Sequence, residues 1–337
     1  MESLKLPITE SPICGLQYLA YPLVISLKYD NYPWFFNNYI QLEAPKEAFL
    51  DSWGCNVTFS GGWFQNVPCI EYQIIKRVDF LNNSQGIVSQ INNFLAKDWY
   101  IYSIFDEFFV PDRISYRSKH NLHDFLLFGT DLTEEYYTIL GYGKNSILDE
   151  STISFRGFVD AFESQFNDSI NDVNIYRINK TYKSEFNLKQ VYELLCEYLK
   201  SQSSSHLYKY NVPFNDSKIY GFEVYDFVIR YFQSLAQDAE NSDIRPLCIL
   251  YEHKSCMVMR LEYMLKNSHI NISQDLLDMF IEIKAEMLKI RNMQIAINFV
   301  KGLYKYETII FALEKIKNIE RIAIEYLLNE IHTTLNK

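Results

Sequence analysis

The sequence predicts a mixed α+β protein, with an α+β head in residues 1–185 and an all-helical C-terminal domain in residues 186–337. Two observations predict this order. The segments that read as strands, rich in β-branched and aromatic residues and bounded by turn-forming residues, fall in the first half of the chain. From about residue 187 onward apolar residues recur at helical spacing, and helices this apolar are expected to pack on the head.

The head is expected to contain helices and an antiparallel meander. A first helix is expected to begin at or just after Cys14, because leucines recur at helical spacing through residue 27. Residues 86–97 and 154–166 have the periodicity of two further amphipathic helices. Three strands are expected in residues 99–110, 123–131 and 135–142.

The C-terminal domain is expected to consist of five helices. Asn187, Asp243 and Ser273 are the residue types that cap helix N-termini, and each precedes a helical stretch. The expected helices cover residues 187–201, 219–236, 243–266, 273–302 and 306–336.

Charge and hydropathy limit the classes of partner that the protein can bind and the compartment in which it is expected. The formal net charge of −10, from 42 acidic and 32 basic side chains, disfavours binding to nucleic acid or to anionic lipid. No apolar run reaches the roughly 18 residues that span a bilayer. The first ten residues include Glu2, Lys5 and Glu10 and lack the apolar core of a signal peptide. We therefore expect a cytoplasmic protein.

The cysteines and histidines do not form a metal-binding pattern. The six cysteines include no CxxC pair, and the six histidines show no ligand spacing with them. We expect no metal and no bound cofactor.

Cys14 is the candidate nucleophile. A thiol at a helix N-terminus is close to unpaired backbone N–H groups and to the positive end of the helix dipole, and both favour the thiolate. The alternative reading is a buried structural cysteine. Cys55 is a weaker candidate, because no helix begins behind it.

His123 is the candidate base, because it opens the second strand of the meander and would project into a cleft beside that strand end. A helix with a cysteine at its start, followed by a meander with histidine at the start of its second strand, is the order of parts in papain-like folds. The alternative is a histidine that hydrogen-bonds a turn.

The third member of the site is expected to orient the imidazole. Asp106, near the end of an antiparallel first strand, should lie close to His123, and Asn145 is the reserve candidate. Asp124 is excluded because adjacent side chains on a strand point to opposite faces. Asp131 is excluded because it lies roughly 26 Å along the strand.

Several stretches carry a resemblance to a known family. They read CGLQYLAYPLVISL, YPWFFNNYIQL, FDEFFVPDRISYRSKHNLHDFLLFGTD, YGFEVYDFVIRYF and RPLCILYEHK. They resemble the butirosin-biosynthesis type of N-acyltransferase, whose head is a papain-like, transglutaminase-like fold. More loosely, the chain is similar to the transglutaminase-like amide-forming enzymes of thiotemplated, closthioamide-type polythioamide biosynthesis.

The resemblance implies amide formation in specialised-metabolite biosynthesis. The acyl group would pass from the phosphopantetheine thioester of an acyl or peptidyl carrier protein to Cys14, and then to a small amine. His123 would be the base and Asp106 its orienter. Gln17, Glu107 and His253 are the expected substrate-binding residues, although a mid-helix histidine such as His253 is more often a packing residue.

Two departures from the related peptidases keep alternatives open. No glutamine precedes Cys14 to supply an oxyanion donor, so the backbone N–H of Cys14 or Gly15 would have to serve. Residues 141–143 read GYG where those peptidases place Asp-Pro. A thiol hydrolase or peptidase of the same fold and a non-catalytic binding protein remain the alternatives.

Overall fold

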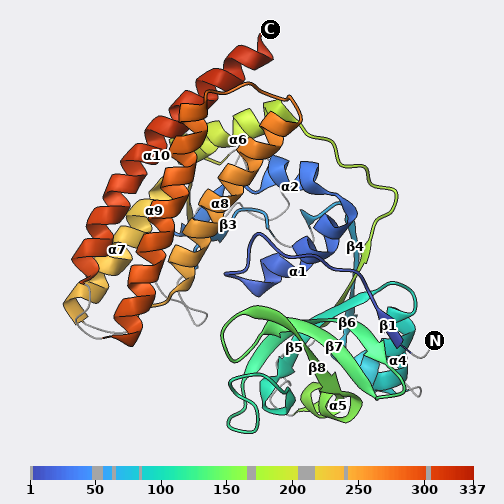
Figure 1. Ribbon diagram of the computed structural model, residues 1–337. Helices are drawn as coiled ribbons and strands as arrows, with labels where there is room; N and C mark the ends of the chain where they lie inside the picture. Colours follow the sequence, from blue (N-terminus) through green and yellow to red (C-terminus); the bar gives the residue numbers. More distant parts are fainter. Residues whose placement is uncertain are drawn as a thin grey trace. The chain divides into compact units, whose positions relative to one another are not determined.

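The computed structural model describes residues 3–47, 56–62, 66–82, 86–164, 172–203, 217–238, 242–300 and 305–337 (Figure 1). The chain folds into two compact units. Unit 1 consists of residues 1–31 and 63–183, and unit 2 of residues 32–62 and 184–337. The protein is mixed α+β, with antiparallel sheets and a helical C-terminal region, which confirms the predicted class. Segment 32–62, assigned to the head from the sequence, belongs to the helical unit.

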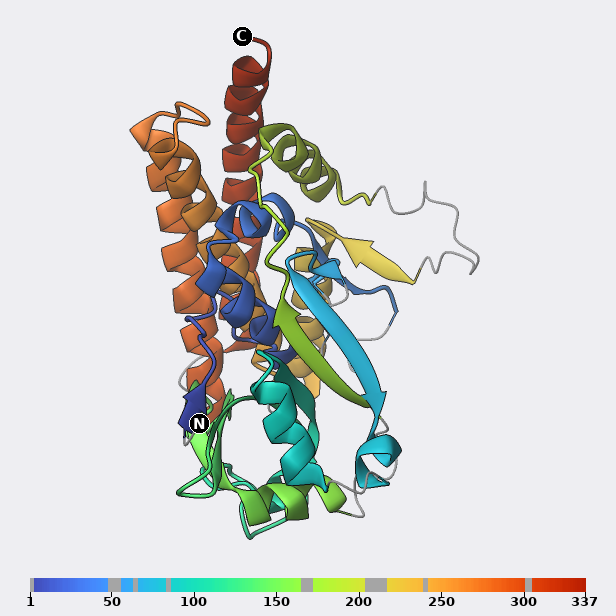
Figure 2. The same cartoon turned by 90° about the vertical axis from the view of Figure 1, so that its right-hand side faces the viewer.

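Unit 1 is built on an antiparallel sheet with the order β4-β9-β5-β6-β7-β8, and β1 pairs with the C-terminal half of β6. Figure 2 shows β4 and β9 running side by side along one edge. The strands are β1 (Ser3–Lys5), β4 (Ile70–Lys76), β5 (Tyr100–Asp106), β6 (Leu122–Asp131), β7 (Tyr136–Tyr142), β8 (Leu148–Ser154) and β9 (Asp172–Ile178).

The predicted meander is confirmed as β5, β6 and β7. In its register Phe105 lies opposite His123, and Asp106 lies opposite Leu122. Strands β1, β4, β8 and β9 were not predicted. In β8 only Ile153 is buried, so this edge strand lacks the apolar alternation by which a strand is recognised.

Helices cover both faces of the sheet. The Tyr21 ring of α1 contacts Tyr102 of β5, whereas the Phe158 ring of α5 contacts Phe105 on the opposite face of the same strand. Ser154 caps α5 by accepting a hydrogen bond from the Gly157 N–H. The helices of unit 1 are α1 (Gln17–Ser26), α3 (Arg77–Leu81), α4 (Ile87–Leu95) and α5 (Phe155–Glu163), with 3₁₀ turns η1 (Leu27–Tyr29) and η3 (Glu107–Phe109).

Unit 2 contains the long helices. The side chains of Asn187 and Ser273 cap α6 and α9 as predicted. Helix α8 instead begins at Arg245 with Ile244 at the N-cap, and the Asp243 carboxylate accepts a hydrogen bond from the Arg245 N–H. The helices are α2 (Tyr32–Asn38), α6 (Leu188–Lys200), α7 (Glu223–Asp238), α8 (Arg245–Lys266), α9 (Gln274–Phe299) and α10 (Tyr306–Leu335). A small sheet has the order β10-β2-β3, from β10 (Lys218–Tyr220), β2 (Leu42–Pro45) and β3 (Thr58–Phe59).

Segment 32–62 is held in unit 2 by polar contacts to its backbone. The buried guanidinium of Arg260 donates to the carbonyl oxygens of Phe36 and Tyr39 at 2.7 and 2.6 Å. The Asn37 side chain donates to the Glu185 carbonyl at 2.8 Å. Because these partners follow unit 1 in the sequence, helical periodicity could not reveal this assignment.

A buried ion pair lies in the core of unit 2. The Lys254 ammonium has three N–H donors and three acceptors: Glu320 Oε1 at 2.7 Å, the Tyr198 hydroxyl at 3.0 Å and His253 Nδ1 at 3.0 Å. Tyr225 donates to the other Glu320 oxygen at 2.6 Å. Every donor of the ammonium is therefore matched, as the burial of a charge requires.

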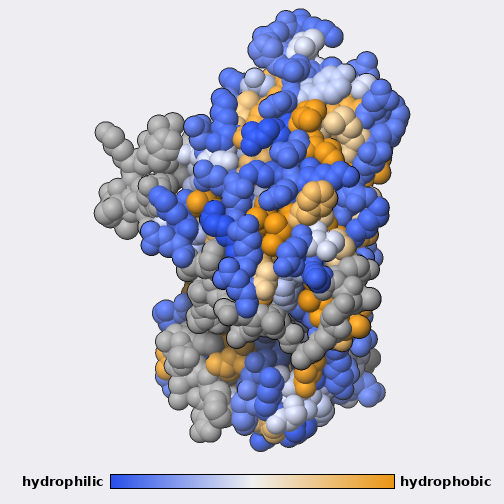
Figure 3. All heavy atoms as spheres, turned by 90° about the vertical axis from the view of Figure 1, so that its left-hand side faces the viewer, coloured by the Kyte–Doolittle hydropathy of each residue, from blue (hydrophilic) through white to orange (hydrophobic). Residues whose placement is uncertain are grey.

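The outer surface of the helical unit is mixed. Figure 3 shows hydrophobic patches within a mostly hydrophilic face. On α10, Phe311 is 70% exposed, and Ile322 and Tyr326 are also exposed. No helix in the described part of the chain combines the length and apolarity needed to cross a membrane.

Candidate functional site

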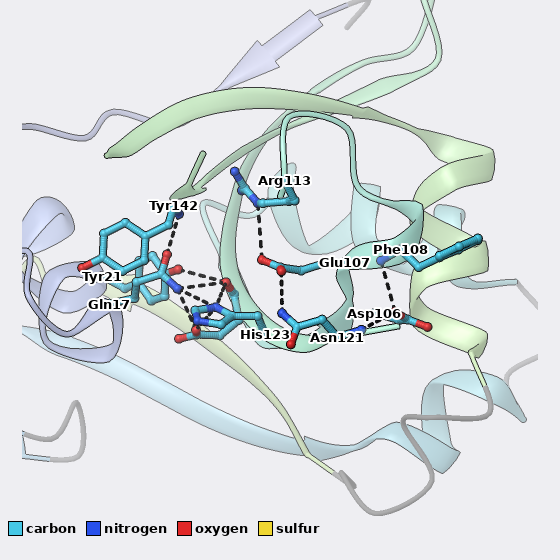
Figure 4. Close-up of polar contacts among 10 residues, drawn as sticks. Gln17, Tyr21, Asp106, Glu107, Phe108, Arg113, Asn121, His123 and Tyr142 are labelled. Atoms are coloured by element: carbon cyan, nitrogen blue, oxygen red, sulfur yellow. Dashed lines mark hydrogen bonds and ion pairs between the residues drawn. The ribbon is translucent and has the colours of Figure 1, made fainter. Parts of the chain in front are cut away.

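Gln17, the first residue of α1, connects three segments of unit 1 (Figure 4). Its Oε1 accepts a hydrogen bond from the Tyr142 N–H at 2.7 Å. Its Nε2 lies 2.8 Å from His123 Nδ1 and 2.9 Å from Asp124 Oδ1. Because a backbone N–H can only donate, the amide oxygen faces Tyr142 and the amide nitrogen faces His123.

Asp124 is the carboxylate beside His123. Its Oδ1 lies 3.0 Å from His123 Nδ1, so the exclusion of Asp124 from the sequence was wrong. His123 is the second residue of β6, and its Nδ1 also lies 3.4 Å from the Asp124 carbonyl oxygen. Near the strand end the ring folds back over the next peptide, so the alternation of side chains does not separate the two residues.

The surroundings of His123 favour its charged form. Burial lowers the pKa of His123, but the hydrogen bond and charge of Asp124 and the charge of Glu107 outweigh burial, so the pKa is raised above its usual value. The charged ring can donate from Nδ1 to Asp124 Oδ1. Gln17 Nε2 then keeps two acceptors, Asp124 Oδ1 at 2.9 Å and the Asp124 carbonyl at 3.3 Å. In the charged state Gln17 Nε2 and His123 Nδ1 are both donors, so Asp124 alone accepts the Nδ1 proton.

Two neighbours of opposite hydrogen-bonding character face the same nitrogen of His123. Gln17 Nε2 can only donate to Nδ1, whereas Asp124 Oδ1 can only accept from it. The contact with Gln17 thus requires an unprotonated Nδ1, and the contact with Asp124 requires a protonated Nδ1.

Cys14 lies in the loop before α1 and not at the helix N-terminus, because the helix begins at Gln17 with Leu16 as N-cap. The helix was predicted to begin at or just after Cys14, and it begins three residues later, so the thiol lies outside its first turn. The half-buried thiol donates to the Ser11 carbonyl at 3.3 Å. The Cys14 carbonyl accepts a hydrogen bond from the Tyr142 hydroxyl. Tyr142 therefore holds both the Cys14 loop and the Gln17 side chain at the end of β7.

Asp106 binds His120 rather than His123. Asp106 Oδ2 lies 2.6 Å from His120 Nδ1 and accepts from the Ser164 hydroxyl at 2.6 Å. The residue opposite His123 is Phe105, so Asp106, one position further, points to the other face. Asn145, the reserve candidate, lies in an exposed turn between β7 and β8.

His120 is a site residue that the sequence reasoning missed. Its ring stacks on Phe108 at 4.5 Å, and its side chain is 38% exposed. The order of residues contained an indication of this contact. When Asp106 at the end of β5 lies opposite Leu122 at the start of β6, the loop residues just before Leu122, which include His120, must lie near Asp106.

Glu107 is nearly buried and lies between two partners. Its Oε2 accepts from the Asn121 side chain at 2.7 Å, and its Oε1 lies 3.9 Å from Arg113 Nε. The Arg113 side chain is 2% exposed, and its two terminal nitrogens have no hydrogen-bond partner among the described residues. A Cβ on Gly141 would lie 2.7 Å from one of these nitrogens, so the guanidinium occupies space that only glycine leaves open.

His253 does not line a pocket. It is fully buried in unit 2, where Nε2 donates to the Ile40 carbonyl at 2.7 Å and Nδ1 accepts from Lys254. Burial, followed by the Lys254 charge, lowers its pKa well below the usual value. His253 is therefore a packing residue and not the substrate-binding residue that was expected.

The cysteines differ in burial. Burial raises the pKa of Cys69 to about 12, of Cys256 to about 12 and of Cys248 to about 11. Cys196 is half-buried on α6. Cys55 lies outside the described residues.

Within the described ranges, no three or more His, Cys, Asp and Glu side chains are grouped to hold a metal ion. Unit 1 is thus an antiparallel sheet with two histidine–carboxylate pairs near the start of β6. A search with the whole sequence found no matching protein-family model and no matching curated protein.

Proposed function

We propose that the protein is a cysteine-dependent acyltransferase that forms an amide, with Cys14 as the nucleophile and His123 as its acid–base partner. The observation that carries the proposal is the hydrogen-bond chain from the Cys14 carbonyl through Tyr142 and Gln17 to His123 and Asp124. It joins a half-buried thiol segment to a histidine whose pKa is raised. A thiolate paired with an imidazolium is the reactive state of cysteine nucleophiles.

The roles follow from the contacts of His123. In the charged state Nδ1 donates to Asp124, which replaces Asp106 as the proposed orienter. The Nε2 proton is then the one that can be given to the leaving thiol of an acyl thioester. Attack by the Cys14 thiolate breaks the C–S bond of the donor and leaves an acyl group on Cys14. Attack by an amine then forms the amide and releases Cys14.

Cys14 is favoured over the other described cysteines. Cys69 and Cys256 are buried with pKa values raised to about 12, and the pKa of Cys248 is raised to about 11, so little thiolate forms on these three at neutral pH. Cys196 lies in unit 2, where the histidine of the core has both ring nitrogens engaged.

The substrate class comes from the family resemblance. It supports the phosphopantetheine thioester of an acyl or peptidyl carrier protein as donor and a small amine as acceptor, within specialised-metabolite biosynthesis in the cytoplasm. The net charge of −10 would favour a positively charged amine over an anionic acceptor.

One observation favours a second function, the binding of a ligand without catalysis. The side-chain amide nitrogen of Gln17 lies 2.8 Å from Nδ1 of His123. Because an amide nitrogen is not a nucleophile, this contact by itself does not imply catalysis. If Cys14 does not react, the half-exposed cluster around His123 would serve as a polar binding site for a small ligand.

The test is acyl transfer from a simple thioester. The full-length protein is incubated with an acyl-pantetheine thioester, and the adduct is located by intact mass and peptide mapping; an amine panel is then added. The proposal expects an acyl group on Cys14 in the wild type and in the control Cys196→Ala, and none in Cys14→Ala. His123→Asn should slow acylation by about 10² to 10⁴-fold.

The outcomes separate the two functions. An adduct on Cys14→Ala at the wild-type rate would contradict the role of Cys14. If the wild type forms no adduct but is stabilised saturably by the same thioester, the protein is a binding protein.

A further inference from the structure

The loop between β5 and β6 has an inverted burial pattern. Arg113 and Ser115 are polar but only 2% exposed, whereas Ile114 is 65% exposed and Tyr116 is 36% exposed. Most proteins bury apolar side chains and expose polar ones, so a loop that does the reverse is informative. Apolar groups gathered at a surface and rimmed by polar ones are typical of protein-interaction sites.

Backbone hydrogen bonds hold this loop in one conformation. The Tyr116 N–H donates to the Arg113 carbonyl at 3.2 Å, and the Arg117 N–H donates to the Phe108 carbonyl at 3.0 Å. The exposed side chains are therefore presented by an ordered backbone. A partner that binds them pays little of the entropic cost of ordering a loop.

The loop packs against the end of β7, beside the candidate site. A Cβ on Gly141 would lie 2.7 Å from a terminal nitrogen of Arg113, so the loop and the strand are in close contact. The next residue, Tyr142, donates from its hydroxyl to the Cys14 carbonyl and from its N–H to Gln17 (Figure 4). The loop therefore lies at the same end of the sheet as the Cys14 segment.

The turn between β7 and β8 extends this surface. A Cβ on Gly143 would lie 3.7 Å from the Asp112 carbonyl oxygen, so the turn lies against the loop. Ile147, at the end of the turn, is 60% exposed. We call the exposed side chains of residues 112–119 and 143–147 the docking surface.

The docking surface carries positive charge on an acidic protein. Arg117, Lys119 and Lys144 are exposed, and in the described part of the chain their side chains form no ion pair with a carboxylate. The exposed carboxylate within the docking surface is that of Asp112, and Asp149 lies just beyond its edge on β8. The formal charge of the whole chain is −10, so this surface differs in sign from the protein as a whole.

Arg117 lies against aromatic rings. Its guanidinium carbon lies 5.8 Å from the ring centre of Phe108 and 5.6 Å from that of Tyr116. A cation over an aromatic face keeps its full charge while its position is restricted. Arginine and tyrosine are also among the residues that contribute most to binding at protein interfaces.

We propose that the docking surface binds the acyl or peptidyl carrier protein that delivers the thioester, and that it recognises an acidic, partly apolar face of that carrier. The inference rests on the proposed function. An acidic protein is repelled by the net charge of the chain and attracted where exposed cations are gathered, so charge directs it to this surface.

The apolar side chains favour a protein face over a purely charged polyanion. Ile114, Tyr116 and Ile147 would form the apolar centre of the contact, and the cations would form its polar rim. Because the phosphopantetheine arm extends from the carrier, the docking surface needs to lie only at the same end of the sheet as the Cys14 segment, and not against the thiol.

The test compares two donors of the same acyl group. Acylation of Cys14 in the full-length protein is measured with acyl-pantetheine, which lacks the protein part of the donor, and with a panel of acidic acyl carrier proteins. The variants are Arg117→Glu, Lys119→Glu and Ile114→Ser. The control is Lys97→Glu, because Lys97 is also exposed but precedes β5, at the opposite end of that strand from the loop.

The expected result is a loss with the carrier-bound donor only. Arg117→Glu and Lys119→Glu should lower kcat/KM for the carrier-bound donor by about 10- to 100-fold, through a higher KM. Added salt should weaken the wild-type reaction with the same donor. Ile114→Ser should lower this kcat/KM by about tenfold, because an apolar contact is lost. With acyl-pantetheine every variant should react at the wild-type rate, and Lys97→Glu should resemble the wild type with both donors.

Each contrary outcome has a distinct meaning. Unchanged carrier kinetics in the charge variants, equal losses with both donors, or a panel in which no carrier-bound donor reacts better than acyl-pantetheine would overturn the docking role while leaving Cys14 as the nucleophile. A wild-type dimer in sedimentation that Arg117→Glu abolishes would assign the surface to a second copy of the chain and also overturn it. A wild type that forms no acyl-Cys14 with either donor would instead overturn the proposed function.

Discussion

The side-chain nitrogen of Gln17 lies 2.8 Å from Nδ1 of His123, while the oxygen of the same amide accepts from the Tyr142 backbone. An uncharged amide at the start of α1 thus fixes the orientation of a histidine at the start of β6. Asp124, on the same nitrogen, sets the charge of the ring. Orientation and charge are therefore controlled by two different residues.

The first prediction concerns the charge of His123. Replacing Asp124 by Asn removes the main group that raises the pKa of His123, so this pKa should fall. A raised pKa contributes stability that is present below about pH 6.5 and is lost as pH rises through the folded-state pKa, so the variant should lose this pH-dependent part. NMR titration of the His123 ring measures the shift. The exposed Asp149→Asn is the control, and an unchanged His123 pKa in Asp124→Asn would contradict the assignment.

The second prediction concerns the buried carboxylate of Asp106. Asp106→Asn replaces an acceptor of four hydrogen bonds, and the free energy of unfolding should fall by about 2–4 kcal/mol at pH 7. Because the pKa of Asp106 is lowered, its contribution is present above about pH 3.9 and is lost as pH falls through the folded-state pKa. Urea denaturation at pH 7 and in acid should show the difference between wild type and variant shrinking in acid. Asp98→Asn, at an exposed ion pair, should have little effect at either pH.

The third prediction concerns the buried ion pair of unit 2. Lys254→Met leaves the Glu320 carboxylate buried without its cation and should cost about 3–5 kcal/mol. The double variant Lys254→Met, Glu320→Leu should be more stable than the sum of the single effects predicts. Chemical denaturation of the four proteins gives the coupling. Lys289→Met, at an exposed pair with Glu286, should change stability by less than about 1 kcal/mol.

The fourth prediction concerns the glycine beside Arg113. A Cβ at position 141 would lie 2.7 Å from a buried Arg113 nitrogen and 3.3 Å from the Phe125 Cβ. Gly141→Ala should therefore destabilise the protein by about 1–3 kcal/mol. Gly143→Ala is the matched control, because its Cβ would meet only the carbonyl oxygens of Asp112 and Ile147 at 3.7 and 3.9 Å. Equal effects of the two substitutions on thermal unfolding would show that Arg113 is not held against Gly141.

The sequence predicted the parts of the fold that depend on local periodicity. Strands β5, β6 and β7 and the helices of the C-terminal region have strong apolar patterns, and they were placed within a few residues. Strand β4 was missed although its residues 70–76 include several β-branched side chains, because its pairing partner is β9, about a hundred residues away along the chain. Long-range pairing leaves no periodic signal.

The sequence predicted most of the residues of the candidate site but not which carboxylate contacts which histidine. Gln17 and His123 do come together, whereas Asp106 belongs to His120 and Asp124 to His123. The assignment of Asp106 failed because one position along a strand reverses the direction of a side chain. The assignment of Asp124 failed because the alternation of side chains does not hold for a ring that folds back near a strand end.

The placement of segment 32–62 in unit 2 has a consequence for how the chain can fold during synthesis. Helix α2 and strand β2 leave the ribosome with the first part of unit 1, but Arg260 and strand β10, which hold them, are made only after unit 1 is complete. A nascent chain must therefore carry the apolar residues Trp34, Phe35 and Phe36 for most of its synthesis before their final partners exist. Neither unit is a contiguous module, so a fragment ending near residue 185 would retain this segment without the helices that bury it, and recombination could not transfer the head as one block.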